Sequence, residues 1–302
     1  MITNKNVANN ADIDLSKLRG LYRTTGKTFY VALTSWSFYK DFVASKPKGT
    51  VFSSIATALA ACVASRGDIV FVLPNYTETV TSTITMSKIG VSLIGLGGRT
   101  QRPTITPNLS ADCINITAAG CTVENIAFAA PLTDSQASDI NVAAAFATIR
   151  DCYHLGSVAT ENKTDIITVA SGGDDLLVEG CRAFNTVVDC VSWLSLEAAV
   201  ARPIIRNNIV QGTFSTAALM DEATATLATI ENNLFKNTKS ATAVVTFTTG
   251  NTTGAMRFNH ISGRHTTLAS NMVTGTGMDF FENRVVEEAQ VNGAVSPAVD
   301  TD

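Results

Sequence analysis

Four aspartates open four apolar segments at nearly equal spacing, and carboxylates in such an array could hold a cation or act as an acid and base pair. They are 27, 26 and 24 residues apart and are Asp112, Asp139, Asp165 and Asp189. If they stack, four like charges repel unless a cation or a raised pKa relieves them. The alternative, which we favour, is that each begins a strand by accepting a local backbone hydrogen bond.

The other residue types with chemical potential give weaker signals. Asp174 and Asp175 follow SGG and predict a turn. The GLGG segment at 95–98, followed by Arg99 and Arg102, lacks the Lys-Ser/Thr ending and the helix of a phosphate loop, so we interpret it as a tight turn. No histidine has metal-ligand spacing, so we predict exposed polar histidines and no metal or cofactor; the histidines are His154, His260 and His265.

A repeat must position these residues, because turn-forming residues recur every 24 to 30 positions along the chain. Gly, Asn and Asp tolerate a left-handed backbone at low cost, so a bend is expected once per period. A period of this length is typical of a solenoid. The predicted turn column consists of Gly95, Asn125, Asp151, Gly180, Asn207, Asn232, Asn259 and Asn283.

The positions before each bend support the same alignment. One step before the bend the charge alternates in sign, through Glu124, Arg150, Glu179, Arg206 and Glu231. Two steps before it the residues are apolar, namely Val123, Ile149, Val178, Ile205 and Ile230. Parallel strands about 4.8 Å apart would stack these side chains into a ladder of opposite charges that fixes the register of the coils. In the seventh coil Arg257 falls in the apolar column and Phe258 in the charged one, and we explain this with a bulge.

A second series of predicted strands fills the rest of each repeat. The pattern therefore predicts an all-β chain that folds as a single-stranded parallel β-helix of about eight coils. We divide it into an N-terminal arm and docking or cap segment at 1–45, the β-helix at 46–285, and a C-terminal tail at 286–302. A helix near 52–64 is expected to cap the first coil, since Phe52, Ile55, Leu59 and Cys62 share one face at helical spacing, with Ser53 as the N-cap.

The N-terminal segment is the candidate interface. Residues 1 to about 20 are polar, as expected of an arm that docks on a partner, although a frayed terminus would have the same composition. Aromatic side chains then crowd together, as is typical of closing cores and subunit contacts. They are Tyr22, Phe29, Tyr30, Trp36, Phe38, Tyr39 and Phe42.

Composition narrows the class of protein. The 302 residues are 45% hydrophobic and 16% charged, which implies extensive buried surface. A net charge of −4 without a Lys/Arg block argues against a nucleic-acid partner. Because the chain has no long apolar span, we expect no membrane partner. We also expect the protein to be made in the cytoplasm and to stay soluble. The six cysteines are expected to be buried thiols, with a disulfide between Cys152 and Cys181 as the open alternative.

The entry segment carries a resemblance to a known family. FSSIATALAAC, RGDIVFVLP with IGLGG, and RPTITPNLSADCINITAAGCTVENIAF are similar to right-handed β-helix proteins of the pectate-lyase-like superfamily. More narrowly, GKTFYVA followed by RGDIVFVLP and IGLGG resembles β-helical virion proteins of tailed bacteriophages. The resemblance spans about residues 26 to 285 and implies a homotrimer on a virion, either a capsid decoration protein or part of a tailspike. The signatures of the family's hydrolases, a GHG tripeptide and an NTD followed by DD, are absent.

Three functional hypotheses follow. The first is a structural virion protein, a trimeric capsid decoration (cement) protein on the capsid surface whose partner is the major capsid protein and which is not an enzyme. The second is a tailspike or tail fibre that binds or cleaves host surface polysaccharide, with Asp112, Asp139, Asp165 and Asp189 as its catalytic residues. The third is a free-standing cytosolic carbohydrate enzyme.

Overall fold

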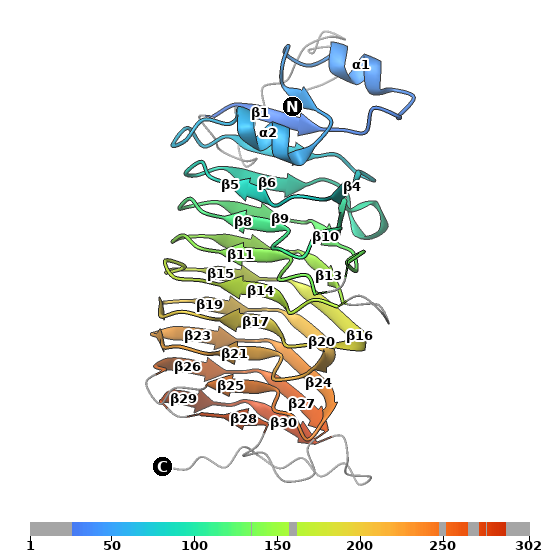
Figure 1. Ribbon diagram of the computed structural model, residues 1–302. Coiled ribbons are helices and arrows are strands. Elements are labelled where there is room, and N and C mark those ends of the chain that lie inside the picture. The colour runs from blue at the N-terminus through green and yellow to red at the C-terminus, as the bar shows by residue number, and fades with distance from the viewer. Residues whose placement is uncertain are drawn as a thin grey trace, which may run out of the picture.

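Short apolar segments separated by turn residues can bury their side chains only by stacking, and the chain does so as a parallel β-helix (Figure 1). The computed structural model describes residues 26–133, 135–156, 162–247, 252–264, 272–275 and 277–287. Every pair of described strands is parallel, and each coil between residues 69 and 274 contributes one strand to each of three sheets, here sheets A, B and C. The predicted fold class is therefore confirmed.

Sheet A has 11 strands and runs the length of the molecule. Val123, Ile149 and Val178 are fully buried and pair in register, so the predicted apolar column lines the core. Its strands, in spatial order, are β2 (Val51–Phe52), β1 (Thr28–Val31), β3 (Ile69–Val72), β6 (Ser92–Gly95), β9 (Thr122–Glu124), β12 (Thr148–Arg150), β15 (Leu177–Glu179), β19 (Ile204–Arg206), β23 (Ala228–Glu231), β26 (Gly254–Arg257) and β29 (Met278–Phe281).

Sheet B has nine strands and begins directly after the turn that ends each strand of sheet A. Its buried column pairs Phe128 with His154 and His154 with Ala183, so a histidine occupies an apolar position. The strands are β4 (Thr77–Val80), β7 (Thr104–Pro107), β10 (Ala127–Phe128), β13 (Tyr153–Leu155), β16 (Arg182–Cys190), β20 (Ile209–Phe214), β24 (Leu234–Ser240), β27 (His260–Arg264) and β30 (Arg284–Glu287).

Sheet C has eight strands, and its Ile114, Ile140, Ile167 and Leu194 pair in register as a fully buried column. Its strands are β5 (Ile84–Met86), β8 (Ile114–Ile116), β11 (Ile140–Val142), β14 (Asp165–Val169), β17 (Ser192–Leu196), β21 (Leu219–Asp221), β25 (Val245–Phe247) and β28 (Val273–Thr274). Two further strands, β18 (Val200–Ala201) and β22 (Ala225–Thr226), pair with each other. Along the chain each of them follows a strand of sheet C and precedes a strand of sheet A.

A second left-handed column connects sheet C to sheet A. The backbone N–H of each member donates to the next coil, for example from Phe146 to Asp174 O at 2.8 Å and from Arg202 to Thr226 O at 2.7 Å. Asp175 belongs to this column, as the turn predicted at SGGDD requires. The full column, with φ between 54° and 72°, is Gly90, Gly120, Phe146, Asp175, Arg202 and Leu227.

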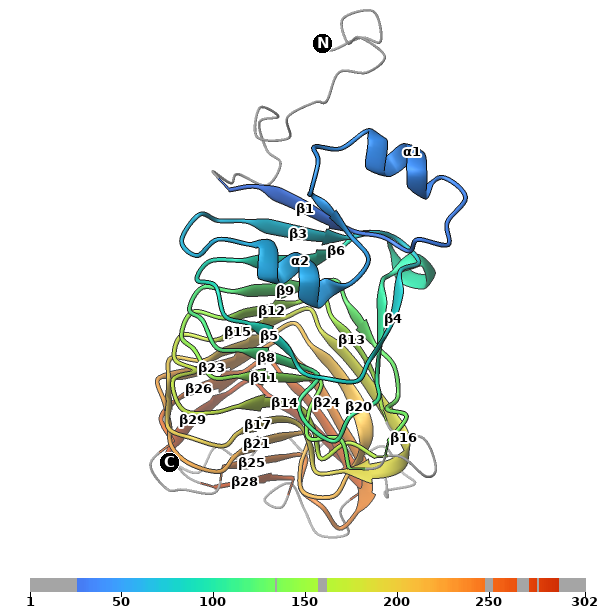
Figure 2. The same cartoon turned by 45° about the horizontal axis from the view of Figure 1, so that its top comes forward.

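Helix α2 (Ile55–Ala61) covers the first coil and contacts β1, β2, β3 and β5 (Figure 2). Its Ile55 and Leu59 are buried, with Cys62 just beyond its end, so an apolar face closes the core. The helix is shorter than predicted, because Phe52 belongs to β2 and the N-cap is Ser54 instead of Ser53, its hydroxyl accepting from Thr57 N at 3.4 Å.

Helix α1 (Tyr39–Ala44) lies beyond the stack, on a connection that leaves β1 and returns at β2 (Figure 2). None of its side chains is buried. No helix in the described part of the chain is long and apolar enough to cross a membrane.

Candidate functional site

The turn column adopts the left-handed backbone at five of its eight predicted positions. The φ angles are 54° at Asn125, 52° at Asp151 and 67° at Gly180, and Asn207 and Asn232 follow at 58° and 56°. Each N–H donates to the next coil. Gly95 instead ends β6 without a positive φ, and a Cβ there would lie 2.1 Å from Asn125 O, so close backbone approach requires this glycine.

The predicted alignment of the last two coils is wrong by one residue. Ile230 pairs with Met256 and Glu231 with Arg257, so Phe258, with φ 58°, occupies the turn column. Its N–H donates to Phe281 O at 3.2 Å, and Glu282 has φ 48° in the final described turn. The register from β23 to β26 is continuous, so the bulge proposed for this coil is absent; aligning Asn259 by residue type with Asn232 caused the error.

Asn259 and Asn283 belong to a different column, a buried asparagine ladder one position after the turn, whereas the sequence alignment had placed them in the turn column. Asn208, Asn233 and Asn259 are each at most 2% exposed. Each Nδ2 donates at 2.9 Å to the Oδ1 of the next coil's asparagine, ending at Asn283, and each Oδ1 also accepts a backbone N–H. The ladder satisfies buried polar groups that would otherwise destabilise the turn.

Cysteines occupy the same position in the earlier coils. Cys152 and Cys181 follow the bend there, and both are buried free thiols. All six cysteines are buried and free, so the prediction of buried thiols is confirmed and the alternative disulfide is not formed. Burial raises the pKa of the Cys190 thiol to about 12, which keeps it protonated and unreactive.

The alternating charges lie beside one another on sheet A. Arg150 donates to Glu124 at 2.7 Å, and Arg206 donates to Glu179 at 2.9 Å. With the corrected register the series continues, because Glu231 accepts from Arg257 at 2.9 Å. The arginine side chains are 38–45% exposed, so each pair stabilises the fold only modestly, and paired charges of this kind align coils instead of performing acid–base chemistry.

The four predicted aspartates do not form one column. Ser138 Oγ donates to Asp112 at 2.8 Å and Ser192 Oγ donates to Asp165 at 2.7 Å, so carboxylates alternate with hydroxyls along sheet C. Asp139 is one position further along its segment and is fully buried. Asp189 falls in β16 of sheet B, and its side chain lies outside the described part. The expected stack of four like charges is therefore absent.

Asp165 has the most perturbed carboxyl of this group. It is 4% exposed. The pKa of Asp165 is raised to about 6, mainly by burial and in part by the charges of Glu197 and Glu222, while the hydrogen bond from Ser192 opposes the rise. A raised pKa suits a general acid, but such an acid must also reach a substrate, and this carboxyl is covered.

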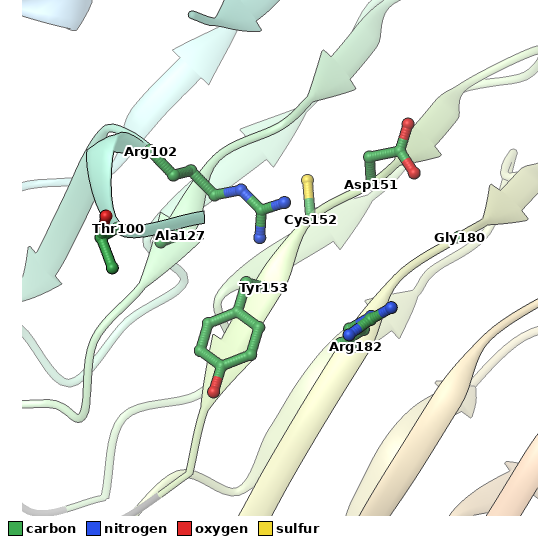
Figure 3. Close-up of a pocket in the computed structure, with 8 residues that line it drawn as sticks. All are labelled: Thr100, Arg102, Ala127, Asp151, Cys152, Tyr153, Gly180 and Arg182. Atoms are coloured by element: carbon green, nitrogen blue, oxygen red, sulfur yellow. The ribbon is translucent and has the colours of Figure 1, made fainter. Parts of the chain in front are cut away.

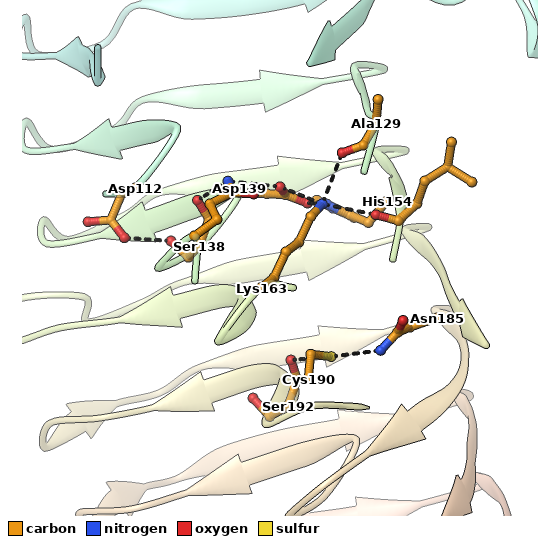
Figure 4. A network of polar contacts seen from close by, with 11 residues as sticks. Asp112, Ala129, Ser138, Asp139, His154, Lys163, Asn185, Cys190 and Ser192 are labelled. Carbon is orange, nitrogen blue, oxygen red and sulfur yellow. Dashed lines mark hydrogen bonds and ion pairs between the residues drawn. The ribbon is translucent and has the colours of Figure 1, made fainter. Parts of the chain in front are cut away.

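Asp139 is the centre of a buried polar network (Figure 4). Lys163 Nζ lies 2.7 Å from it and also donates to the backbone oxygens of Leu155 at 2.9 Å and Ala129 at 3.2 Å. His154 Nδ1 contacts the same carboxylate at 3.0 Å. The side chains of Asp139, His154 and Lys163 are all fully buried, so the network joins sheets B and C inside the core and does not face a substrate.

The prediction that His154 is exposed is wrong. Its ring stacks on Phe128 at 5.0 Å and 4°, since it takes the inward position of β13. Burial lowers the pKa of His154, although its hydrogen bond to the Asp139 carboxylate opposes this change, so the ring is neutral at neutral pH. Aligning YHL at 153–155 with AF at 127–128 and RAF at 182–184 would have predicted the buried position of His154. His260 is half-buried, and His265 lies outside the described residues.

The aromatic segment divides between core and surface. Phe29 is 4% exposed and contacts Phe52 edge-on at 5.9 Å, so it belongs to the core. Tyr30 connects sheet A with α1. The centre of its ring lies 6.1 Å from that of Phe71 on the outer face of sheet A and 5.6 Å from that of Phe42 in α1. Tyr22 lies outside the described residues.

The remaining aromatics and α1 form an exposed surface, here called the α1 face, made of Trp36, Phe38, Tyr39 and Val43. Phe38 is 53% exposed and Val43 is 38% exposed, while Trp36 and Tyr39 are half-buried. Trp36 stacks on Phe38 at 5.2 Å. The stack and the Tyr30–Phe42 contact hold an apolar surface at the end of the rod, where water covers it in the single chain.

The chain matches no protein-family model and no curated protein. Solved structures with a similar fold include Escherichia coli YbhC, at 12% identity and a TM-score of 0.50, with 85% of each chain covered. Pectate lyase Pel9A aligns at 13% identity and a TM-score of 0.42, covering 91% of this chain and 82% of its own. ORF18 of Geobacillus virus E2 aligns at 13% identity and a TM-score of 0.34, covering 78% and 57%. At these identities the comparison supports only the parallel β-helix fold.

Proposed function

We propose that the chain is a structural virion protein, a capsid decoration protein that docks on the shell of a tailed bacteriophage through its N-terminal end. The α1 face is the observation that carries this proposal. It projects beyond the stacked coils, buries none of its helix's side chains within the chain, and presents Phe38 and Val43 to water. Aromatic and aliphatic residues at the centre of a contact supply most of its binding energy.

The arrangement of the carboxylates also supports a structural role. Asp112 and Asp165 accept hydrogen bonds from serines, and Asp139 holds the buried Lys163. These carboxylates therefore have partners within the fold. A homotrimer of such rods, with the major capsid protein as partner, is the assembly we propose, and light scattering should then give about three times the chain's 31.9 kDa.

Capsid binding tests the proposal directly. Purified chain should co-sediment with expanded capsids, and the Phe38→Glu/Val43→Glu variant should bind at least about tenfold more weakly, because it places charges in an apolar contact. Leu227→Glu is the matched control, since Leu227 is 65% exposed on a distant coil. Deleting 1–45 is unsuitable, because it removes β1 and the buried Phe29. Failure of the unaltered chain to bind would refute the proposal.

The alternative is a tailspike or tail fibre that binds or cleaves host polysaccharide. Asp165 is the residue that would favour it, because its pKa of about 6 is that of a usable acid. Under this alternative the chain shortens a capsular polysaccharide and Asp165→Asn abolishes the cleavage while the protein stays folded. We favour the structural role because Asp165 is 4% exposed and bonded to Ser192.

A further inference from the structure

Lys163 and Asp139 bring an amine and a carboxyl group together inside the core (Figure 4). Lys163 Nζ lies 2.7 Å from Oδ1 of Asp139 and 2.7 Å from Oδ2. An atom this close to both oxygens is also within about 3–3.5 Å of the carbon between them, the separation at which positioned groups react. The ion pair therefore places a nucleophile beside an acyl carbon.

Backbone hydrogen bonds fix the two segments that carry this pair. Gln136 and Lys163 are partners in a parallel bridge between adjacent coils. Thr164 N donates to Gln136 O at 2.7 Å, and Asp139 N donates to Ile166 O at 3.0 Å. Because both side chains leave from paired backbone, the fold itself holds the amine against the carboxyl group.

The hydrogen bonds of Lys163 orient its amine. Nζ donates to Leu155 O at 2.9 Å and to Ala129 O at 3.2 Å. When one proton has moved from the ammonium to the Asp139 carboxylate, these backbone oxygens accept the two remaining hydrogens, and the lone pair faces the carboxyl group. Both side chains are fully buried, and an apolar core lowers the cost of this proton transfer because it disfavours separated charges.

His154 supplies a hydrogen-bond donor at the same carboxyl group. Its Nδ1 lies 3.0 Å from Oδ2 of Asp139, and because a carboxylate only accepts, Nδ1 carries the proton and donates it. Nε2 has no hydrogen-bond partner in the described part of the chain, so the polar contact of the ring is made at the reacting group. Stacking on Phe128 fixes the ring, and a fixed donor stabilises negative charge that develops on Oδ2.

We propose that Lys163 and Asp139 react to form an isopeptide bond that links two neighbouring coils covalently. The ion pair is the starting state, and its proton moves from Nζ to Oδ1. The neutral amine then attacks Cγ, and the negative charge collects on Oδ2, which His154 binds. A second proton passes from Nζ to Oδ1, the Cγ–Oδ1 bond breaks, and one water molecule leaves as the Nζ–Cγ amide forms. No electrons are exchanged and no co-reactant is required.

The bond would join the segment before β11 to the segment before β14, and it is independent of capsid docking, since the network lies in the core and the α1 face at the end of the rod. Intact-mass spectrometry of the full chain, repeated at intervals after purification at neutral pH, tests the proposal. The chain should become lighter than its sequence by one water molecule. A mass that stays equal to that of the sequence would overturn the proposal.

Peptide mapping locates the link. Trypsin together with a glutamate-specific protease leaves Asp139 in the peptide 125–150 and Lys163 in the peptide 162–179, because trypsin does not cleave after an acylated lysine. The peptide 151–161 between them is released, so a branched product of the two outer peptides can arise only through their side chains. This branched product is the expected result, and a lost water that maps to any other residue would contradict the proposal.

Two variants test the roles of the partners. Lys163→Met retains every aspartate and should keep its full mass, so a water loss that persists in it would refute the participation of Lys163. His154→Phe keeps a ring against Phe128 without the donor, and the link should form at least about tenfold more slowly. His260→Phe is the matched control, because His260 is half-buried in β27 outside the network, and it should leave the rate unchanged. Equal rates in the two histidine variants would exclude the role of His154.

Discussion

Replacing Asp139 with asparagine should destabilise the chain strongly, because the substitution removes the carboxylate that contacts the buried ammonium of Lys163. Both side chains are fully buried and their charged groups lie 2.7 Å apart. In the Asp139→Asn variant the ammonium keeps the backbone oxygens of Leu155 and Ala129, which are dipoles and only partly compensate a charge. The variant is nearly isosteric, so the loss reports on electrostatics and not on packing.

The expected loss is about 3–5 kcal/mol in the free energy of unfolding, the range for breaking a buried ion pair from one side. Since domains are stable by only about 5–15 kcal/mol, the change is large enough to measure by urea unfolding. Fluorescence of Trp193 is a suitable signal, because this tryptophan is fully buried and belongs to the same core.

A double variant separates the charge from the rest of the network. Adding Lys163→Met to Asp139→Asn removes the buried ammonium and keeps an unbranched apolar chain in its place, so the double variant should be more stable than Asp139→Asn alone. A loss below about 1 kcal/mol for Asp139→Asn, or a double variant as unstable as the single one, would show that the network is not the ionic core described above.

Two further substitutions should stabilise the chain. Because the pKa of Asp165 is about 6 in the folded chain, against an ordinary 3.8, its carboxyl favours folding at low pH and opposes it increasingly as pH rises from 3.8 to 6. Asp165→Asn should therefore gain at most about 3 kcal/mol above pH 6 and nothing near pH 3, and a gain independent of pH would contradict this. Phe258→Asn should gain about 1 kcal/mol, since Phe258 is 50% exposed at φ 58° where earlier coils have Asn; an unchanged melting temperature would argue against backbone strain there.

The period was readable from the sequence because the turn imposes a strong requirement on residue type. At Asn125, Asp151 and Gly180 the left-handed backbone selects residues that tolerate it, and the buried positions two steps earlier are uniformly aliphatic. The same reasoning failed at Phe258, because the fold tolerates a bulky residue there and Asn259 serves the neighbouring ladder. The second turn column was not predicted for a similar reason. Besides glycine it contains Phe146, Arg202 and Leu227, which are not residue types that mark a left-handed turn.

The chemistry was less predictable, because a shift of one position in a strand moves a side chain to the other face. Spacing alone placed Asp139 beside Asp112 and Asp165, whereas the fold buries it against Lys163. His154 was misassigned because a polar residue in a core column has a favourable energy only when its partners, here Asp139 and Phe128, come from distant segments. A pocket lined by Ala127, Tyr153 and Arg182 takes these residues from three strands, β10, β13 and β16, so no local motif marks it (Figure 3).

The central proposal is that the α1 face attaches this rod to a capsid. Electron microscopy of expanded capsids incubated with the purified chain is the most direct measurement. We predict added density on the outer shell, with the end that carries Phe38 and Val43 against the capsid surface and the last coils pointing away. Capsids without added density, or density that persists with the Phe38→Glu/Val43→Glu variant, would contradict the proposal.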